Sequence, residues 1–93
     1  MNIHSVWDNQ GTSVDRYTVV LDVLHYGEYV YLSLGNDPSS PQGFSQWGTT
    51  DYSPREFKIF GKRIDFSDLP QRLQGHVTMR ISELSDSIEE EVS

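Results

Sequence analysis

The chain has 93 residues, of which 35% are hydrophobic and 12% aromatic, and its formal net charge is −7. A chain of this length forms a single domain with a thin core, because a domain of this size buries only roughly 60 to 65% of the surface that its unfolded chain exposes. The absence of cysteine excludes disulfides, thiol redox chemistry and a thiolate zinc site.

The negative charge is concentrated near the C-terminal end. Residues 83–93 contain five acids and no base, which accounts for −5 of the −7 and leaves −2 for the rest of the chain. The one cluster of basic residues consists of Arg55, Lys58, Lys62 and Arg63. Nucleic-acid binding normally requires a basic face, so we expect no nucleic-acid partner.

Signals for export or membrane insertion are absent from the sequence. The first residues contain no basic segment followed by an apolar run, and no stretch of 18 consecutive apolar residues occurs. We therefore expect a cytoplasmic protein that does not enter a membrane.

The segment 1–14 is polar apart from Ile3, Val6 and Trp7. It has no clear period, and we expect either an arm or a short edge strand. The segments 17–25 and 29–34 are rich in β-branched and aromatic residues and alternate between two faces. A glycine at Gly27 lies between them, which predicts a β-hairpin with a tight turn.

A long loop rich in Pro, Gly and Ser is predicted for residues 38–54. It carries three large aromatic side chains, Phe44, Trp47 and Tyr52. Structureless loops of this length are uncommon in compact domains and are usually functional or disordered. Two interpretations remain open: the loop plugs the sheet face that one helix leaves bare, or it binds a partner.

The sheet face in need of cover is itself apolar. It is predicted to present Val20, Leu24, Tyr29 and Tyr31. For the alternative, in which the loop is an interface, Tyr, Trp and Arg are the residue types enriched at binding hot spots. The candidate partner-binding residues are Phe44, Gln46, Trp47, Tyr52 and Arg55.

A second, shorter hairpin is predicted after the loop. Residues 56–60 and 63–66 each alternate apolar and polar side chains, with Gly61 and Lys62 between them.

The clearest helix of the chain is predicted to begin at Ser67 as N-cap, with Asp68 and Pro70 in its first turn. Apolar residues then follow at spacings of three or four, at Leu69, Leu73, Val77, Ile81 and Leu84. We expect this stripe to pack on one face of the sheet. The acidic segment 85–93 is expected to form a fraying tail, because successive glutamates near a helix C-terminus oppose the helix dipole.

No pattern names a reaction, a metal site or a cofactor. His4, His25 and His76 do not pair at ligand spacing, and no glycine-rich phosphate-binding loop occurs. We therefore expect no cofactor and no enzyme activity. An enzyme remains an alternative if three carboxylates, Asp22, Asp51 and Asp65, converge in space.

These observations predict an α+β domain: a small antiparallel sheet of two hairpins joined by a long aromatic loop, with one C-terminal amphipathic helix packed on the sheet. The expected boundaries are 1–14 for the arm, 15–84 for the domain and 85–93 for the tail. By elimination, we expect a non-catalytic, protein-binding regulator, adaptor or inhibitor, of the kind that phages and mobile elements encode, as a monomer or weak homodimer. The alternatives are an acidic mimic of nucleic acid and a small enzyme.

Overall fold

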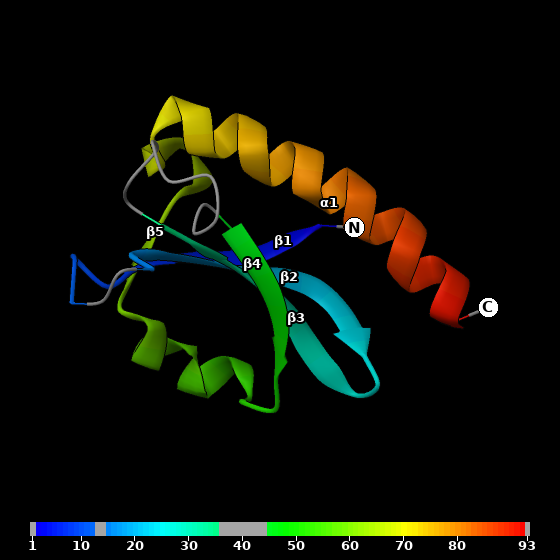
Figure 1. The fold of residues 1–93 in the computed structure, drawn as a ribbon. Helices are drawn as coiled ribbons and strands as arrows, with labels where there is room; N and C mark the ends of the chain where they lie inside the picture. Colours follow the sequence, from blue (N-terminus) through cyan, green and yellow to red (C-terminus); the bar gives the residue numbers. More distant parts are fainter. Residues whose placement is uncertain (1, 13–14, 36–44, 93) are drawn as a thin grey trace.

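A computed structural model describes residues 2–12, 15–35 and 45–92, with the backbone alone at 45–46 and 87–92. In these residues a five-stranded antiparallel sheet lies between two helical layers (Figure 1). One layer is the α-helix α1 (Gln71–Val92) and the other is the 3-10 helix η1 (Pro54–Phe60). The predicted α+β class, an antiparallel sheet with one C-terminal helix, is confirmed.

The strands are β1 (Ile3–Asp8), β2 (Tyr17–His25), β3 (Glu28–Leu34), β4 (Ser45–Thr50) and β5 (Lys62–Ile64). Their order across the sheet is β4-β3-β2-β1-β5. The N-terminal segment therefore forms a strand, but this strand lies inside the sheet and not at an edge. Part of the predicted loop 38–54 is also different, because residues 45–50 form β4 and pair with β3, whereas 38–44 lie outside the described residues.

A bulge explains why β1 has no clear period in the sequence. Ile3 pairs with Leu21, but the next pair is Ser5 with Val20, so the register shifts by one residue. A bulge of this kind places two neighbouring residues opposite one partner and interrupts the alternation of faces. Ile3 and Val6 consequently pack in the same core although three positions separate them.

The hairpin predicted between 17–25 and 29–34 is confirmed. His25 pairs with Glu28, and the two residues between them form the turn. Tyr26 and Gly27 both have positive φ, at 52° and 82°. A type I′ turn requires positive φ at both central residues. Hairpins favour this turn because its twist matches that of the strands.

The face of the sheet under α1, called here the helix face, carries the larger core. Leu73 and Val77 of the predicted stripe are buried with Val19 and Leu32 of the central strands. The full buried set is Val6, Tyr17, Val19, Leu21, Val30, Leu32, Leu34, Leu69, Leu73, Val77 and Leu84. The prediction that the helical stripe packs on the sheet is confirmed.

The predicted start of the helix is wrong by one turn. Ser67 is not an N-cap but lies in the short 3-10 helix η2 (Phe66–Asp68), and α1 begins after Pro70. The physical reason is Pro70, because a proline disfavours the helical region for the residue before it. Leu69 has extended backbone angles, φ −67° and ψ 145°. The Pro70 carbonyl then accepts the first helical hydrogen bonds, from the amides of Leu73 and Gln74.

The far end of α1 also differs from expectation. The helical backbone continues to Val92, through the segment that we expected to fray. In Figure 1 this end of α1 extends past the β2–β3 hairpin.

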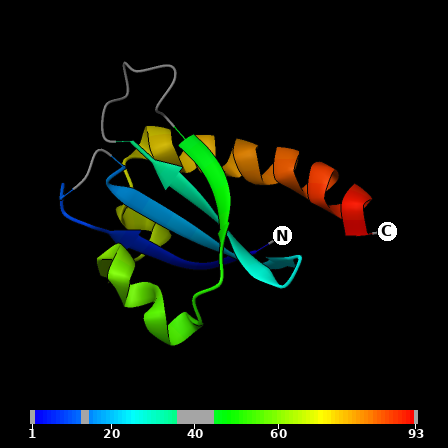
Figure 2. The same cartoon turned by 60° about the horizontal axis from the view of Figure 1, so that its bottom comes forward.

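The face of the sheet opposite α1 is covered by η1, and the predicted second hairpin is wrong. Residues 54–60 form a 3-10 helix, and 62–64 form β5, which pairs with β1. Figure 2, in which this side is turned forward, shows η1 beside β1. Phe57 is fully buried there, in one cluster with Trp7 and Val20.

The sequence around Ser53 explains why a helix forms where alternation suggested a strand. Pro54 occupies the first helical position, and the Ser53 amide and hydroxyl both donate to the Glu56 carboxylate at 3.0 Å. These hydrogen bonds lower the pKa of Glu56. Serine followed three residues later by glutamate, with proline after the serine, is a helix-start pattern, and it prevails here over the alternation.

Candidate protein-binding surface

The structure separates the residues that the sequence grouped into one binding loop. Phe44 lies outside the described residues, and Gln46 and Trp47 belong to β4. Trp47 pairs with Leu32 of the helix face, and paired residues on antiparallel strands share a face. Tyr52 instead contacts the ring of Phe60 on the opposite face, with ring centroids 6.2 Å apart.

Cover for the opposite face comes from η1, not from Trp47. The rings of Phe57 and Phe60 lie 5.9 Å apart, and Phe57 also contacts Tyr29 edge to face at 5.3 Å. Trp47 and Tyr52 keep 41% and 37% of their surface exposed. Among the described residues, the plug predicted for 38–54 is therefore supplied mainly by 57–60.

Three rings form a row along the hairpin end of the helix face. His25 lies between Tyr26, at a centroid distance of 4.4 Å, and Trp47, at 5.9 Å, and both contacts are edge to face. We call Tyr26, His25 and Trp47 the aromatic row. It joins the turn after β2 to the outer strand β4, and Tyr26 is 84% exposed.

Tyr26 occupies a position that a bulky residue rarely takes. Its φ of 52° is in the left-handed region, where side chains other than Gly, Asn and Asp cost roughly 1 to 2 kcal/mol. Type I′ turns normally place Asn, Asp or Gly there. Tyr26 is thus a strained, exposed ring in contact with one other ring, that of His25, and such strain is commonly found at functional sites.

His25 and Tyr26 were not among the candidate binding residues predicted from the sequence. A signal was present in "HYGE", residues 25–28, where tyrosine stands in a two-residue turn at the position that favours asparagine.

Acidic residues occur in and next to the strands that carry the aromatic row. The Glu28 carboxylate accepts a hydrogen bond of 3.1 Å from the Thr49 hydroxyl, so it leans from β3 toward β4. Asp51 follows β4 at the hairpin end of the sheet, and Asp22 is exposed on β2. No Lys or Arg occurs in the sequence between Arg16 and Arg55. The strands that carry the row, β2 to β4, therefore contain acids and no Lys or Arg.

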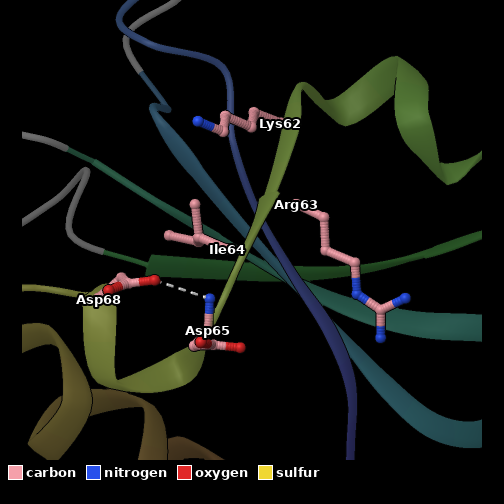
Figure 3. Close-up of a pocket in the computed structure, with 5 residues that line it drawn as sticks. All are labelled: Lys62, Arg63, Ile64, Asp65 and Asp68. Carbon is pink, nitrogen blue, oxygen red and sulfur yellow. Dashed lines mark hydrogen bonds between the residues drawn. The ribbon is translucent and has the colours of Figure 1, made fainter.

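Two members of the basic cluster, Lys62 and Arg63, lie on opposite sides of β5. Adjacent residues on a strand point to opposite sides, and Figure 3 shows Lys62 and Arg63 of β5 pointing away from one another. A groove of about 390 Å³ beside them is lined by Lys62, Arg63, Ile64, Asp65 and Asp68. Asp68 is already engaged, because its Oδ2 accepts the Asp65 amide at 3.0 Å (Figure 3).

A second hollow, of about 360 Å³, lies on the opposite face between η1 and the β1–β2 connection. It is lined by Asn9, Thr12, Asp15, Thr18, Tyr31, Ser33, Ile59 and Phe60. Asn9 holds the connection itself, since its Nδ2 donates to the Asp15 carbonyl and its Oδ1 accepts the Gly11 amide. Asn9 of this lining therefore stabilises the connection, and the lining residues include no group of convergent charges.

The three carboxylates considered for an enzyme site do not converge. Asp51 follows β4 and Asp65 follows β5, which are the two outer strands of the sheet. Within the part of the chain that the structure describes, no group of three or more His, Asp or Glu side chains is placed to hold a metal ion.

Comparison with known proteins finds no protein-family model, curated protein or solved structure that matches this chain. Of the helices in the described residues, none is both long and apolar enough to span a membrane.

Proposed function

We propose that this protein is a non-catalytic regulator, adaptor or inhibitor that binds another protein through the aromatic row. The observation that carries the proposal is Tyr26, a large, exposed ring held in a strained turn conformation and in contact with His25, which in turn contacts Trp47. A turn residue chosen for folding alone would be Asn or Gly.

The row has the composition and rigidity of an interface anchor. Tyrosine and tryptophan are enriched at hot spots, where truncation costs 2 kcal/mol or more. Their side chains here are held by a strand pair and a two-residue turn, so less conformational entropy is lost on binding. Glu28, which pairs with His25 of the row, favours a partner with a basic surface and disfavours partners of like charge.

The test compares affinity purification of wild type and variants from the organism that encodes the protein, with mass spectrometry of the bound proteins. Tyr26→Asn is the sharpest variant, because asparagine tolerates the left-handed backbone and should leave stability unchanged or higher. We expect it to lose partners that the wild type retains, and Trp47→Ala to lose the same ones. Ile59→Ala and Met79→Ala are the controls, since both residues are exposed, at 66% and 52%, and lie outside the row.

Two results would contradict the proposal. One is a folded Tyr26→Asn variant that keeps every partner. The other is the loss of all partners on deleting residues 85–93 while the row variants bind normally, which would favour the acidic mimic instead.

A further inference from the structure

The two outer strands of the sheet differ in how they meet solvent. β5 has three residues and carries Lys62 and Arg63. β4 has six residues, Ser45–Thr50, and carries no charge. Among the described residues β4 has a neighbouring strand on one side alone. Short length and lysine are devices by which sheets discourage pairing at an edge, and β4 has neither.

An added strand next to β4 would meet the aromatic row and one carboxylate. Trp47 and Thr49 face the same side of β4, because they pair with Leu32 and Val30 of the helix face. The Thr49 hydroxyl donates to the Glu28 carboxylate at 3.1 Å, so this carboxylate reaches from β3 to the outer strand β4. A lysine or arginine from an added strand, opposite Thr49, would reach this carboxylate and lie near the Trp47 ring.

We propose that β4 accepts an extended segment of a partner protein as a further antiparallel or parallel strand, with a Lys or Arg side chain of that segment directed at Glu28 and Trp47. The inference rests on the proposed function and specifies how the partner binds. Main-chain hydrogen bonds supply affinity in such strand addition, and alternate side chains supply specificity.

Charge decides between this occupant and a second copy of the chain. The face beside β4 carries Glu28 and Asp51, and the sequence has no Lys or Arg between Arg16 and Arg55. Pairing β4 with β4 of another copy would bring these acids together, whereas a basic segment would neutralise them. A cation over Trp47 would gain further attraction from the ring.

The experiment uses the full chain and two short blocked peptides of alternating threonine and valine, one with a central lysine and the other with a central glutamate. Amide hydrogen exchange is followed by NMR. Every second amide of an edge strand points outward and exchanges with water. We expect the lysine peptide to slow exchange at alternate positions of β4, and to bind about three- to fivefold more tightly than the glutamate peptide.

Two pairs of matched variants test the charge. Glu28→Gln keeps an acceptor for Thr49 and should abolish the preference for lysine, whereas Glu83→Gln makes the same charge change on α1 and should not. Thr49→Lys supplies a built-in cation and should abolish binding of the lysine peptide. Thr78→Lys, on an exposed position of the helix, is its control.

The inference is overturned if neither peptide binds, if binding leaves exchange at β4 unchanged, or if sedimentation shows a dimer that β4 substitutions dissolve. These failures are distinct from failure of the proposed function. If a partner requires Tyr26 for binding but does not change amide exchange in β4, the aromatic row is still the interface. The strand-addition proposal is then wrong.

Discussion

The two faces of the sheet are covered by different means. On the helix face, α1 contributes three buried residues of one stripe, Leu73, Val77 and Leu84, and Leu69 just before the helix adds a fourth. On the opposite face, η1 contributes one fully buried side chain, Phe57, with partly buried Phe60 beside it. Cover by a long helix is distributed over several turns, whereas cover by a 3-10 helix depends on a single ring. The opposite face should therefore be the more sensitive to one substitution.

Phe57→Ala is expected to have the largest effect, a loss of about 3 to 5 kcal/mol in the free energy of unfolding. Its ring contacts the rings of His4, Tyr29 and Phe60, and no other described aromatic residue of η1 is fully buried. Urea unfolding followed by tryptophan fluorescence measures the change. Ile59→Ala, at an exposed position of the same helix, should cost little and serves as the control.

Leu73→Ala on the helix face should cost about 2 to 5 kcal/mol. Leu73 is buried in the larger core, but its neighbours on the stripe remain to hold α1 in place. If Leu73→Ala unfolds the protein while Phe57→Ala leaves it stable, the ranking of the two faces is reversed. A cost below about 1 kcal/mol for both would show that neither residue has the packing described.

The helix face was predictable because one period accounts for it. Apolar residues three or four apart give a stripe whatever else surrounds them, and 17–25 and 29–34 alternate as strands do. The cover of the opposite face was not predictable, because a strand-like pattern and a helix-start pattern compete at 53–60. Alternation of Phe57 and Ile59 suggested a strand, but the serine, proline and glutamate at the start of the segment are stronger local determinants.

Other differences have equally specific causes. The bulge at His4 and Ser5 hides the period of β1, and pairing of β5 with β1 joins segments more than fifty positions apart, which no local pattern records. For the candidate site, Trp47 was predicted and is exposed, but its neighbour His25 depends on the register of three strands.

Gly61→Ala tests the connection that holds η1 under the sheet. Gly61 has φ 121°, and an added Cβ would lie 2.3 Å from the Asp8 carbonyl oxygen, an atom of the β1 backbone. The strained backbone alone should cost about 1 to 3 kcal/mol, and the clash adds to this. The melting temperatures of Gly61→Ala and wild type, compared by thermal unfolding, measure this loss of stability. An alanine variant as stable as wild type would show that β1 does not pass this close to Gly61.

Gly75→Ala is the corresponding change in the other layer, with the opposite sign. Gly75 lies within α1, and no atom lies within 4 Å of the position that its Cβ would take. Alanine should raise the free energy of unfolding by about 0.5 to 1 kcal/mol, because it restricts the unfolded chain and favours helix. A decrease would indicate a neighbour in contact with this side of α1.

The smallest effect is expected at an ion pair that belongs to neither layer and ties β1 to the segment before β2. The Asp8 carboxylate accepts hydrogen bonds from Arg16, at 2.9 and 3.2 Å, and from the Gln10 amide at 2.7 Å. The hydrogen bond from Arg16 is the main cause that lowers the pKa of Asp8 below its usual value.

A carboxyl group with a lowered pKa in the folded state stabilises the fold above its unfolded pKa of about 4, and this contribution is lost as the pH falls through the folded pKa. Asp8→Asn should therefore be less stable than wild type at pH 7, and the difference should narrow as the pH falls below about 4. Urea unfolding of both proteins at pH 7 and near pH 3 measures this difference in stability.

Glu83→Gln is the control, because it removes the exposed ion pair of Glu83 with Arg80. It should change stability by a few tenths of a kcal/mol at most, about what such surface pairs contribute. The carboxylate charge does not stabilise this end of the sheet if Asp8→Asn and wild type have the same free energy of unfolding at pH 7. The same conclusion holds if they differ as much near pH 3 as at pH 7.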